Sequence, residues 1–520
     1  MHPAGPPHHA GIHVSQAPTT GFFGHPVGLR TLFLTEMWER FSYYGLRPLL
    51  VLFMSAALLD GGFGLERSQA SAIVGIYAAC VYLASLPGGW IADRWLGLRR
   101  SIYYGAILIT LGHLSIGLSG LAGQGTSGKL AFFAGLVLIV MGTGLLKPNI
   151  SAIVGDLYPE GGARRDAGFS IFYMGINTGA FVGQLVTGFL GESIGWHWGF
   201  GAAGVGMFFG LVSFKLFAPS TLGDLGTEIV RHPDAAVQAR QERSVKMVVG
   251  IILASIVALF ALVASGVVTL DPQAIGLNMV YVLVGFGALF FGFVFLDSSL
   301  TRQEKKQAVV ILVLFIFAAL FWAAFEQAPT SLNLFARDFT NRVVGGFEIP
   351  ATWFQSVNSA WIIIFAPVAA AVWVGLAKRG GDLSAPAKFA LGLAFAGVGF
   401  GLMVIVAKDV VASGGTLKVS PMWLVWSYLF QTLGELCLSP VGLSSMTKLA
   451  PRKYVGQMMG IWFLAASVGN LIAGLVGGRV DPEKLDQMPE LFLWTAVALF
   501  ITAAILGLMI KPIKRMIEAN

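Results

Sequence analysis

The sequence has little charge and almost no cysteine. Only 12% of its 520 residues are Asp, Glu, Lys or Arg, about half of the share that is usual in soluble domains. The apolar share of 56% and the mean hydropathy of +0.74 leave more apolar surface than a soluble fold can hide. Cys80 and Cys437 both lie in apolar runs, which excludes a disulfide framework and a cysteine metal site. We therefore predict a chain that folds in a lipid bilayer.

The start of the chain lacks the basic residues and the apolar run of a signal peptide. It is rich in His, Pro and Gly, and we predict a disordered tail over residues 1–27. The net charge of +7 does not indicate a nucleic-acid partner, because the excess Lys and Arg of a membrane protein gather in its cytoplasmic loops.

Fourteen segments are candidate membrane-spanning helices, each with roughly 20 mostly apolar residues. Six precede residue 220, two follow a long charged loop, and six complete the chain. The predicted spans are residues 31–57, 69–92, 98–119, 130–154, 167–193, 198–218, 245–269, 276–296, 307–335, 351–376, 387–407, 421–447, 455–478 and 489–510.

The loops between these spans differ in their content of Lys and Arg. An even number of spans places both termini on one side of the membrane. If that side is the cytoplasm, the cytoplasmic segments hold 23 of the 34 Lys and Arg residues and the outer loops hold 8. This bias follows the positive-inside rule, and it predicts cytoplasmic termini.

The order of the spans is six, two and six. Two six-helix halves with a substrate between them are the plan of major facilitator transporters. We predict an all-α membrane protein of the major facilitator superfamily fold, with two six-helix bundles and a two-helix insertion. The N-terminal bundle is predicted at residues 28–219, the linker and inserted helices at 220–300, and the C-terminal bundle at 301–520.

Seven ionisable residues lie inside the predicted spans. Each costs roughly 2.5–3.5 kcal/mol on insertion scales, so we expect them to face one another, or a cavity on a substrate or proton path. The alternative is an ion network that only holds helices together. Positions 36, 40, 43 and 47 fall on one stripe of the first helix. Three cations face four carboxylates, so one bound proton would balance the cluster. The seven residues are Glu36, Glu39, Arg40, Arg47, Lys147, Glu326 and Glu435.

Seven motifs, in order, resemble those of the proton-dependent oligopeptide transporters. The first is EMWERFSYYG, from Glu36 to Gly45. The likeness covers nearly the whole chain from about residue 22, and the two extra helices resemble those of bacterial members with fourteen helices. The other motifs are GGWIADRWLG from Gly88, GLLKPNIS from Gly144, FYMGINTGAF from Phe172, FWAAFEQ from Phe321, WFQSVN from Trp353 and GELCLSPVGLS from Gly434.

The resemblance implies a role for individual residues. Glu36, Glu39 and Arg40 match a triad tied to proton coupling, and Lys147 is expected to pair with its acids. The resemblance also implies that Arg40 and Lys147 bind the carboxylate of a peptide, and that Glu435 binds its amino group with Asn177 and Asn358 beside it. It implies that Arg47 and Glu326 pair across the halves to close the outer side. The residues implied to line the pocket are Tyr43, Tyr44 and Tyr82, and those implied to shape side-chain pockets are Trp322 and Trp462.

These implications predict a symporter that imports di- and tripeptides together with protons by alternating access. We expect no cofactor other than the proton gradient, no nucleic-acid partner, a functional monomer, and a place in the bacterial inner membrane. Two alternatives keep the fold, namely a carrier of nitrate or another anion and a drug exporter. Glu435 disfavours the anion carrier, because an anion gains nothing from a carboxylate. A membrane enzyme or a receptor is disfavoured, since the sequence shows no metal-ligand spacing, nucleophile elbow or nucleotide loop.

Overall fold

The computed structural model describes residues 21–160, 162–229, 233–381 and 383–518. This part of the chain contains fourteen helices of 21 to 32 residues and one short helix, α10, at Asn333–Phe339. Twelve helices are long and apolar enough to cross a membrane, and α1 and α13 match them in length. The predicted all-α fold with fourteen long helices is confirmed. Residues 1–20 of the predicted tail lie outside the described residues.

The first six helices form the N-terminal bundle. Within it α1 packs against α5 and α6, and α3 packs against α4 and α6. Glycines bring the backbones of α3 and α4 together: a Cβ atom at Gly105 or at Gly142 would lie 2.6 Å from the carbonyl oxygen of the other residue. Such small-residue contacts are the usual way in which helices associate in lipid. The helices are α1 Val27–Ser55, α2 Arg67–Ile91, α3 Leu98–Leu118, α4 Thr126–Asp156, α5 Gly162–Phe189 and α6 Trp196–Leu222.

The C-terminal bundle contains α9 and the helices that follow it. Here α12 packs against α13 and α15, and α9 packs against α14 and α15. A short hairpin of β1 (Val343–Val344) and β2 (Phe347–Glu348) turns at Gly345 and Gly346, whose positive φ angles of 58° and 84° suit glycine. The long helices are α9 Arg302–Phe325, α11 Trp353–Lys378, α12 Ala385–Ala412, α13 Met422–Leu449, α14 Val455–Gly477 and α15 Gln487–Glu518.

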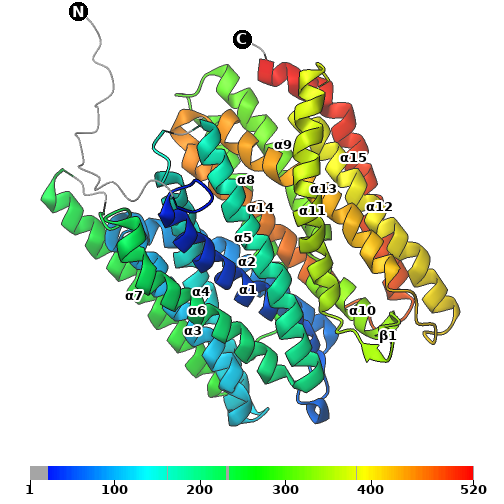
Figure 1. The fold of residues 1–520 in the computed structure, drawn as a ribbon. Helices are drawn as coiled ribbons and strands as arrows, with labels where there is room; N and C mark the ends of the chain where they lie inside the picture. The colour runs from blue at the N-terminus through cyan, green and yellow to red at the C-terminus, as the bar shows by residue number, and fades with distance from the viewer. Residues whose placement is uncertain (1–20, 161, 230–232, 382, 519–520) are drawn as a thin grey trace, which may run out of the picture.

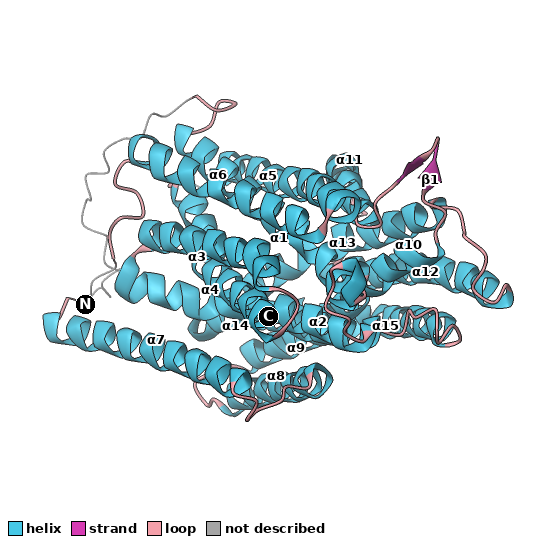
Figure 2. Cartoon of the chain, turned by 90° about the horizontal axis from the view of Figure 1, so that it is seen from below, coloured by secondary structure: helices cyan, strands magenta, loops and turns pink. Residues whose placement is uncertain are grey.

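The two inserted helices, α7 (Ala235–Ala264) and α8 (Pro272–Leu296), pack against the bundles in different ways. Near its start α7 touches the N-terminal bundle, where Val245 is buried and the Lys246 ammonium lies 5.7 Å from the ring centre of Trp95. The most apolar stretch of α7 is unburied, and Figures 1 and 2 show the helix at the edge of the molecule. In contrast, α8 packs against α14 and α2.

A polar contact ties the end of α8 to the start of α14. The Lys453 ammonium and the Tyr454 hydroxyl donate to Asp297 Oδ2 at 2.7 and 2.6 Å. These hydrogen bonds hold the pKa of the Asp297 carboxyl well below its usual range, and the one from Lys453 contributes most. The insertion is therefore fixed to the C-terminal bundle at this end.

The two bundles are joined mainly toward one end of the molecule. We call the end at which α1 begins and α15 ends the terminal face, and the opposite end the distal face (Figure 1). Among the described residues, the hydrogen bonds and ion pairs between the bundles lie in the distal half or near the middle of the helices. They include Arg67 with Asp338 at 2.5 Å, Asn333 with the Pro48 carbonyl at 2.8 Å, and Glu192 with the amides of Ala351 and Thr352 at 2.8 and 2.9 Å.

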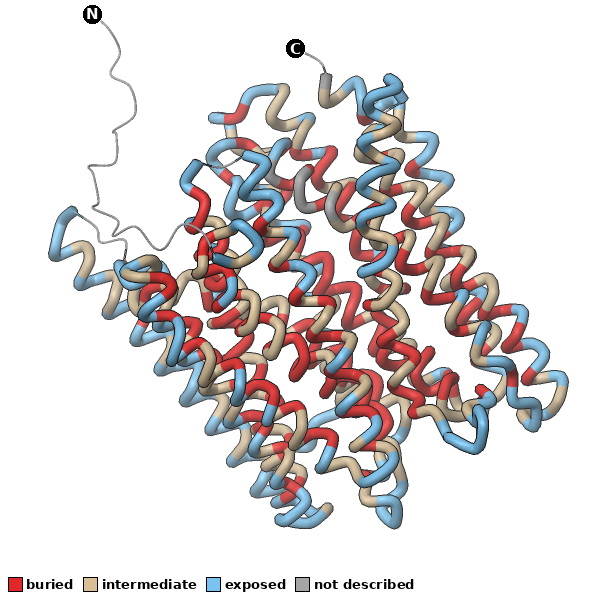
Figure 3. The backbone as a smooth tube through the Cα atoms, in the orientation of Figure 1, coloured by how far each residue is buried: buried red, intermediate tan, exposed pale blue. Residues whose placement is uncertain are grey.

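Backbone contact between α2 and α14 completes this closure. A Cβ atom at Gly474 would lie 2.6 Å from the Cα atom of Gly75 and 2.7 Å from the Ser71 carbonyl oxygen. In Figure 3 the buried segments run through the centre of the molecule, and exposed ones cover its outside. The distal side is thus closed by direct contact between helices of the two bundles.

We predict that Gly474→Ala destabilises the protein, whereas Gly375→Ala does not. The added methyl group at position 474 has no room, and overpacking costs about 1–3 kcal/mol. Gly375 lies in α11 with nothing within 4 Å of an added Cβ, so alanine there gains helix propensity of up to about 1 kcal/mol. Apparent melting temperatures of the purified variants in one detergent measure both effects. Equal melting temperatures for the two variants would contradict the proposed contact.

Candidate functional site

A buried charge cluster lies on α1. Arg40 Nε is 3.0 Å from Glu36 Oε1 and 2.5 Å from Glu39 Oε2, and all three side chains are buried. Glu36 and Arg40 are four residues apart and therefore share a helix face. The Arg40 guanidinium also lies 5.4 Å from the ring centre of Tyr43. The stripe predicted for the first helix is present, and one guanidinium contacts both acids.

Lys147 on α4 lies near the acids of α1 without a direct ion pair to them. Among the described residues no carboxylate lies within 4.0 Å of its ammonium group, although Arg40 and both acids of α1 are within electrostatic range. The Lys147 ammonium lies 4.3 Å from the ring centre of Tyr82 on α2, a cation–π contact. Arg40 already contacts both carboxylates, and Lys147 has no ion-pair partner in the part of the chain that the structure describes.

The second ion pair joins the two bundles. Arg47 Nη2 on α1 donates to Glu326 at the end of α9, and also to Asn470 Oδ1 on α14 at 2.9 Å. Arg47 and Glu326 are each 6% exposed. The pair therefore links α1 of one bundle to α9 and α14 of the other in the interior of the protein.

Glu435 is a third centre of charge, on α13. Its Oε2 atom accepts a long hydrogen bond of 3.4 Å from Asn358 Nδ2, which also donates to Thr432 Oγ1 at 2.8 Å. Among the described residues it has no cation within 4.0 Å. Tyr173 on α5 lies within electrostatic range of Glu435, and its carbonyl accepts a hydrogen bond of 3.0 Å from Asn177 Nδ2.

Aromatic side chains lie on the helices that carry these charges and their partners. Tyr43 and Tyr44 meet edge to face with ring centres 5.1 Å apart. The ring of Trp322 on α9 is perpendicular to that of Phe325, with the ring centres 5.5 Å apart. The ring of Trp462 on α14 lies so close to Gly442 that a Cβ atom there would come within 2.1 Å of it.

A sequence profile described as the POT family matches residues 99–221 and 292–486. The chain is also 50% identical over 497 residues to the peptide transporter YePEPT of Yersinia enterocolitica, with 96% of each chain covered. The chain belongs to the POT family. A di-/tripeptide transporter of Lactococcus lactis is 36% identical to this POT chain, with 95% of this chain and 97% of the relative covered. The family makes the chain an integral membrane transporter of the major facilitator type and not an enzyme.

Solved POT structures share the whole fold. A variant of a peptide transporter in complex with alafosfalin has a TM-score of 0.86 at 40% identity, covering 96% of this chain and 98% of that one. A POT family transporter in complex with 5-aminolevulinic acid has a TM-score of 0.84 at 33% identity, covering 96% and 99%.

Several polar residues of this POT chain were not predicted from its sequence. Tyr77 on α2 stacks on Tyr43 with ring centres 6.2 Å apart, and Asn470 binds Arg47. Tyr44, Arg47, Glu326 and Asn358 also line a small cavity with further uncharged residues. A survey of amides and phenols within the spans would have found these additional residues, which are Gln184, Gln355, Tyr428 and Gln431.

We predict that Arg47→Met lowers the stability of this POT protein and that Arg47→Met combined with Glu326→Leu restores most of it. Removal of one partner leaves a buried charge unpaired and costs about 3–5 kcal/mol, whereas an apolar replacement of both partners is often neutral. Thermal unfolding followed by tryptophan fluorescence measures the difference. If the double variant is as unstable as the single one, lost packing and not the unpaired charge explains the effect.

Proposed function

We propose that this POT transporter imports di- and tripeptides together with protons, by alternating access of a site between its bundles. The observation that carries the proposal is the pair of half-buried charges that have no ion-pair partner within the described residues. Lys147 supplies a cation from the N-terminal bundle, and Glu435 supplies an anion from the C-terminal bundle. A ligand with a carboxylate at one end and an ammonium group at the other would satisfy both.

A short peptide has this chemistry. Arg40 and Lys147 would bind its carboxylate, since Arg offers a planar fork and Lys a compact point charge. Glu435, held by Asn358, would bind its ammonium group, with Asn177 nearby. The aromatic walls would accept varied side chains because they offer shape and apolar surface without specific hydrogen bonds. The pocket walls would be formed by Tyr43, Tyr44, Tyr82, Trp322 and Trp462.

The relatives support the peptide as cargo. The Yersinia enterocolitica relative is named a peptide transporter, and the Lactococcus lactis relative a di-/tripeptide transporter. Alafosfalin is bound to a transporter with the same fold. A plain anion carrier would have no use for Glu435.

The closed distal side supports an orientation for the cycle. We propose that the terminal face is cytoplasmic, as the distribution of Lys and Arg indicates, and that the distal face is outside. The contacts of Arg47 with Glu326 and of Arg67 with Asp338 would then close the outer side. Rocking of the bundles would break them and expose the site outward. One chain contains both bundles, so a monomer suffices.

Proton coupling is proposed to act through the α1 cluster. Protonation of Glu36 or Glu39 would release Arg40 for the peptide carboxylate. Loss of that proton on the cytoplasmic side would return the carboxylate to Arg40 and weaken the hold on the peptide. One charge that crosses a potential of 100 mV supplies about 2.3 kcal/mol, and a pH gradient adds to this.

The test is uptake of radiolabelled dialanine by liposomes that contain only this protein, with and without an inward proton gradient. We expect uphill uptake that a protonophore abolishes. Folded protein that moves no di- or tripeptide would overturn the proposal, and labelled nitrate in the same liposomes would then test the anion carrier. Liposomes without protein are the control.

We predict that Glu36→Gln and Glu39→Gln abolish uphill dialanine uptake but retain dialanine exchange at equal pH. The amide keeps the shape of the side chain but cannot exchange a proton, so the site still alternates while its coupling is lost. Counterflow of labelled against unlabelled dialanine measures exchange. If uphill uptake survives in both variants, these residues do not couple the proton.

A further inference from the structure

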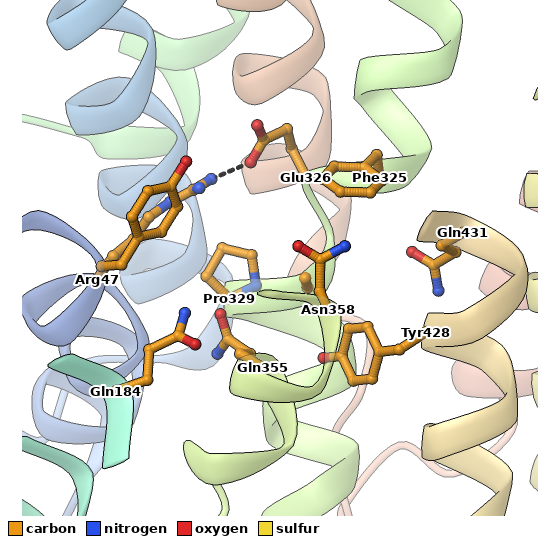
Figure 4. A pocket seen from close by; sticks show the side chains of 11 residues that line it. Arg47, Gln184, Phe325, Glu326, Pro329, Gln355, Asn358, Tyr428 and Gln431 are labelled. Atoms are coloured by element: carbon orange, nitrogen blue, oxygen red, sulfur yellow. Dashed lines mark hydrogen bonds and ion pairs between the residues drawn. The ribbon is translucent and has the colours of Figure 1, made fainter. Parts of the chain in front are cut away.

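The cavity of about 40 Å³ lies where the two bundles meet (Figure 4). The N-terminal bundle contributes Arg47 and Gln184 to its wall, and the C-terminal bundle contributes Glu326, Gln355 and the start of α13. Gln184 lies eight residues before Glu192 along the chain, and Gln355 lies three residues after Thr352. The cavity is thus placed between the distal contact of Glu192 with Thr352 and the ion pair of Arg47 with Glu326.

The walls carry polar atoms without hydrogen-bond partners. Gln184 Oε1, Gln355 Nε2, Tyr428 Oη and Gln431 Oε1 are buried, and none has a partner among the described residues. Their side chains come from α5, α11 and α13 and converge on one space in Figure 4. Each residue is at most 7% exposed. Since these four polar atoms belong to residues that line the same cavity, one ligand in the cavity could supply the missing hydrogen bonds.

Water satisfies these groups best. A buried polar group without a partner costs roughly 1–3 kcal/mol, so nearly all such groups in native proteins are bonded to protein or ordered water. One water needs a cavity of roughly 10–15 Å³ and two to four polar partners. The volume here suffices for roughly two or three waters, and carbonyl, amide and hydroxyl groups supply both donors and acceptors.

We propose that this cavity is a binding site for ordered water that bridges the two bundles and hydrates the Arg47–Glu326 pair as the distal side opens. Separation of a buried ion pair is opposed by the desolvation of both charges. Water held at the pair lowers this opposition, because it solvates each charge as soon as the contact breaks. The amides of Gln184 and Gln431 keep the water in place on the two sides of the cavity.

The role predicts a defect that differs from a loss of coupling. Gln184→Leu and Gln431→Leu remove the water-binding group at nearly constant shape. Opening of the distal side is part of uphill uptake and of exchange, so both slow together. A coupling residue, in contrast, affects uphill uptake alone. This part of the inference rests on the proposed transport cycle, whereas the water site itself does not.

The water site is tested by X-ray radiolytic hydroxyl labelling read by mass spectrometry, because bound water makes even a buried side chain reactive. We expect Tyr428 to label several-fold faster than Phe132, which is fully buried in the N-terminal bundle. Gln431→Leu should reduce the labelling of Tyr428, and Gln431→Asn, which keeps an amide, should retain most of it. Labelling of Tyr428 no faster than that of Phe132 overturns the water site.

The gating role is tested by dialanine counterflow with the same variants. We expect exchange and uphill uptake to fall together by about tenfold in Gln184→Leu and Gln431→Leu, equivalent to about 1.4 kcal/mol in the barrier, and to recover in Gln431→Asn. Melting temperatures identify variants that fail to fold. Lost labelling with unchanged exchange overturns the gating role. Wild-type protein that labels at Tyr428 but moves no peptide contradicts the proposed function and leaves the water site standing.

Discussion

The ion pair of Arg47 and Glu326 is the interaction on which the closed distal side depends. It joins α1 to α9, and through Asn470 it reaches α14, so three helices of two bundles meet at one guanidinium. Around it the bundles approach as closely as backbones allow, at Gly75 and Gly474. The same two helices are joined by a hydrogen bond from Ser467 Oγ to the Ala79 carbonyl at 3.2 Å. Together with the contacts of Arg67 with Asp338 and of Glu192 with Thr352, the ion pair holds the distal side closed.

The other charged residues of the site differ in whether they have an ion-pair partner. Arg40 contacts two carboxylates on its own helix, whereas Lys147 and Glu435 have no ion-pair partner among the described residues. An unpaired charge in a low-dielectric interior costs free energy, and a bound ligand of opposite charge offsets this cost. The zwitterionic cargo proposed for this POT transporter would serve as that counter-ion on both sides.

Much of the fold could be predicted from hydrophobic length, and the differences have local causes. The span predicted at 245–269 is helical from Ala235, because Asp234 caps a helix whose start is rich in polar and charged residues, which an apolar window omits. The continuous span predicted at 307–335 ends as an α-helix at Phe325, and Pro329 lies in a π-helical turn, Ala328–Leu332, before α10. The charged residues of the site were found because each is expensive in lipid. A count of charges does not detect Gln184, Gln355 and Gln431, because their amide side chains are uncharged. The position of Lys147 depends on which carboxylates Arg40 contacts, which spacing alone does not determine.

The separate attachment of α7 and α8 has a consequence for the surrounding bilayer. Since the most apolar stretch of α7 is unburied, acyl chains must solvate it, and the circumference of the protein in the membrane is larger than two compact bundles would need. Asp297 ties the end of α8 to the C-terminal bundle, while α7 meets the N-terminal bundle at Val245 and Lys246. A rocking motion of the bundles would therefore rearrange the lipids around the protein as well. The rate of such a motion would depend on the viscosity of the bilayer, and its free energy on the thickness of the bilayer.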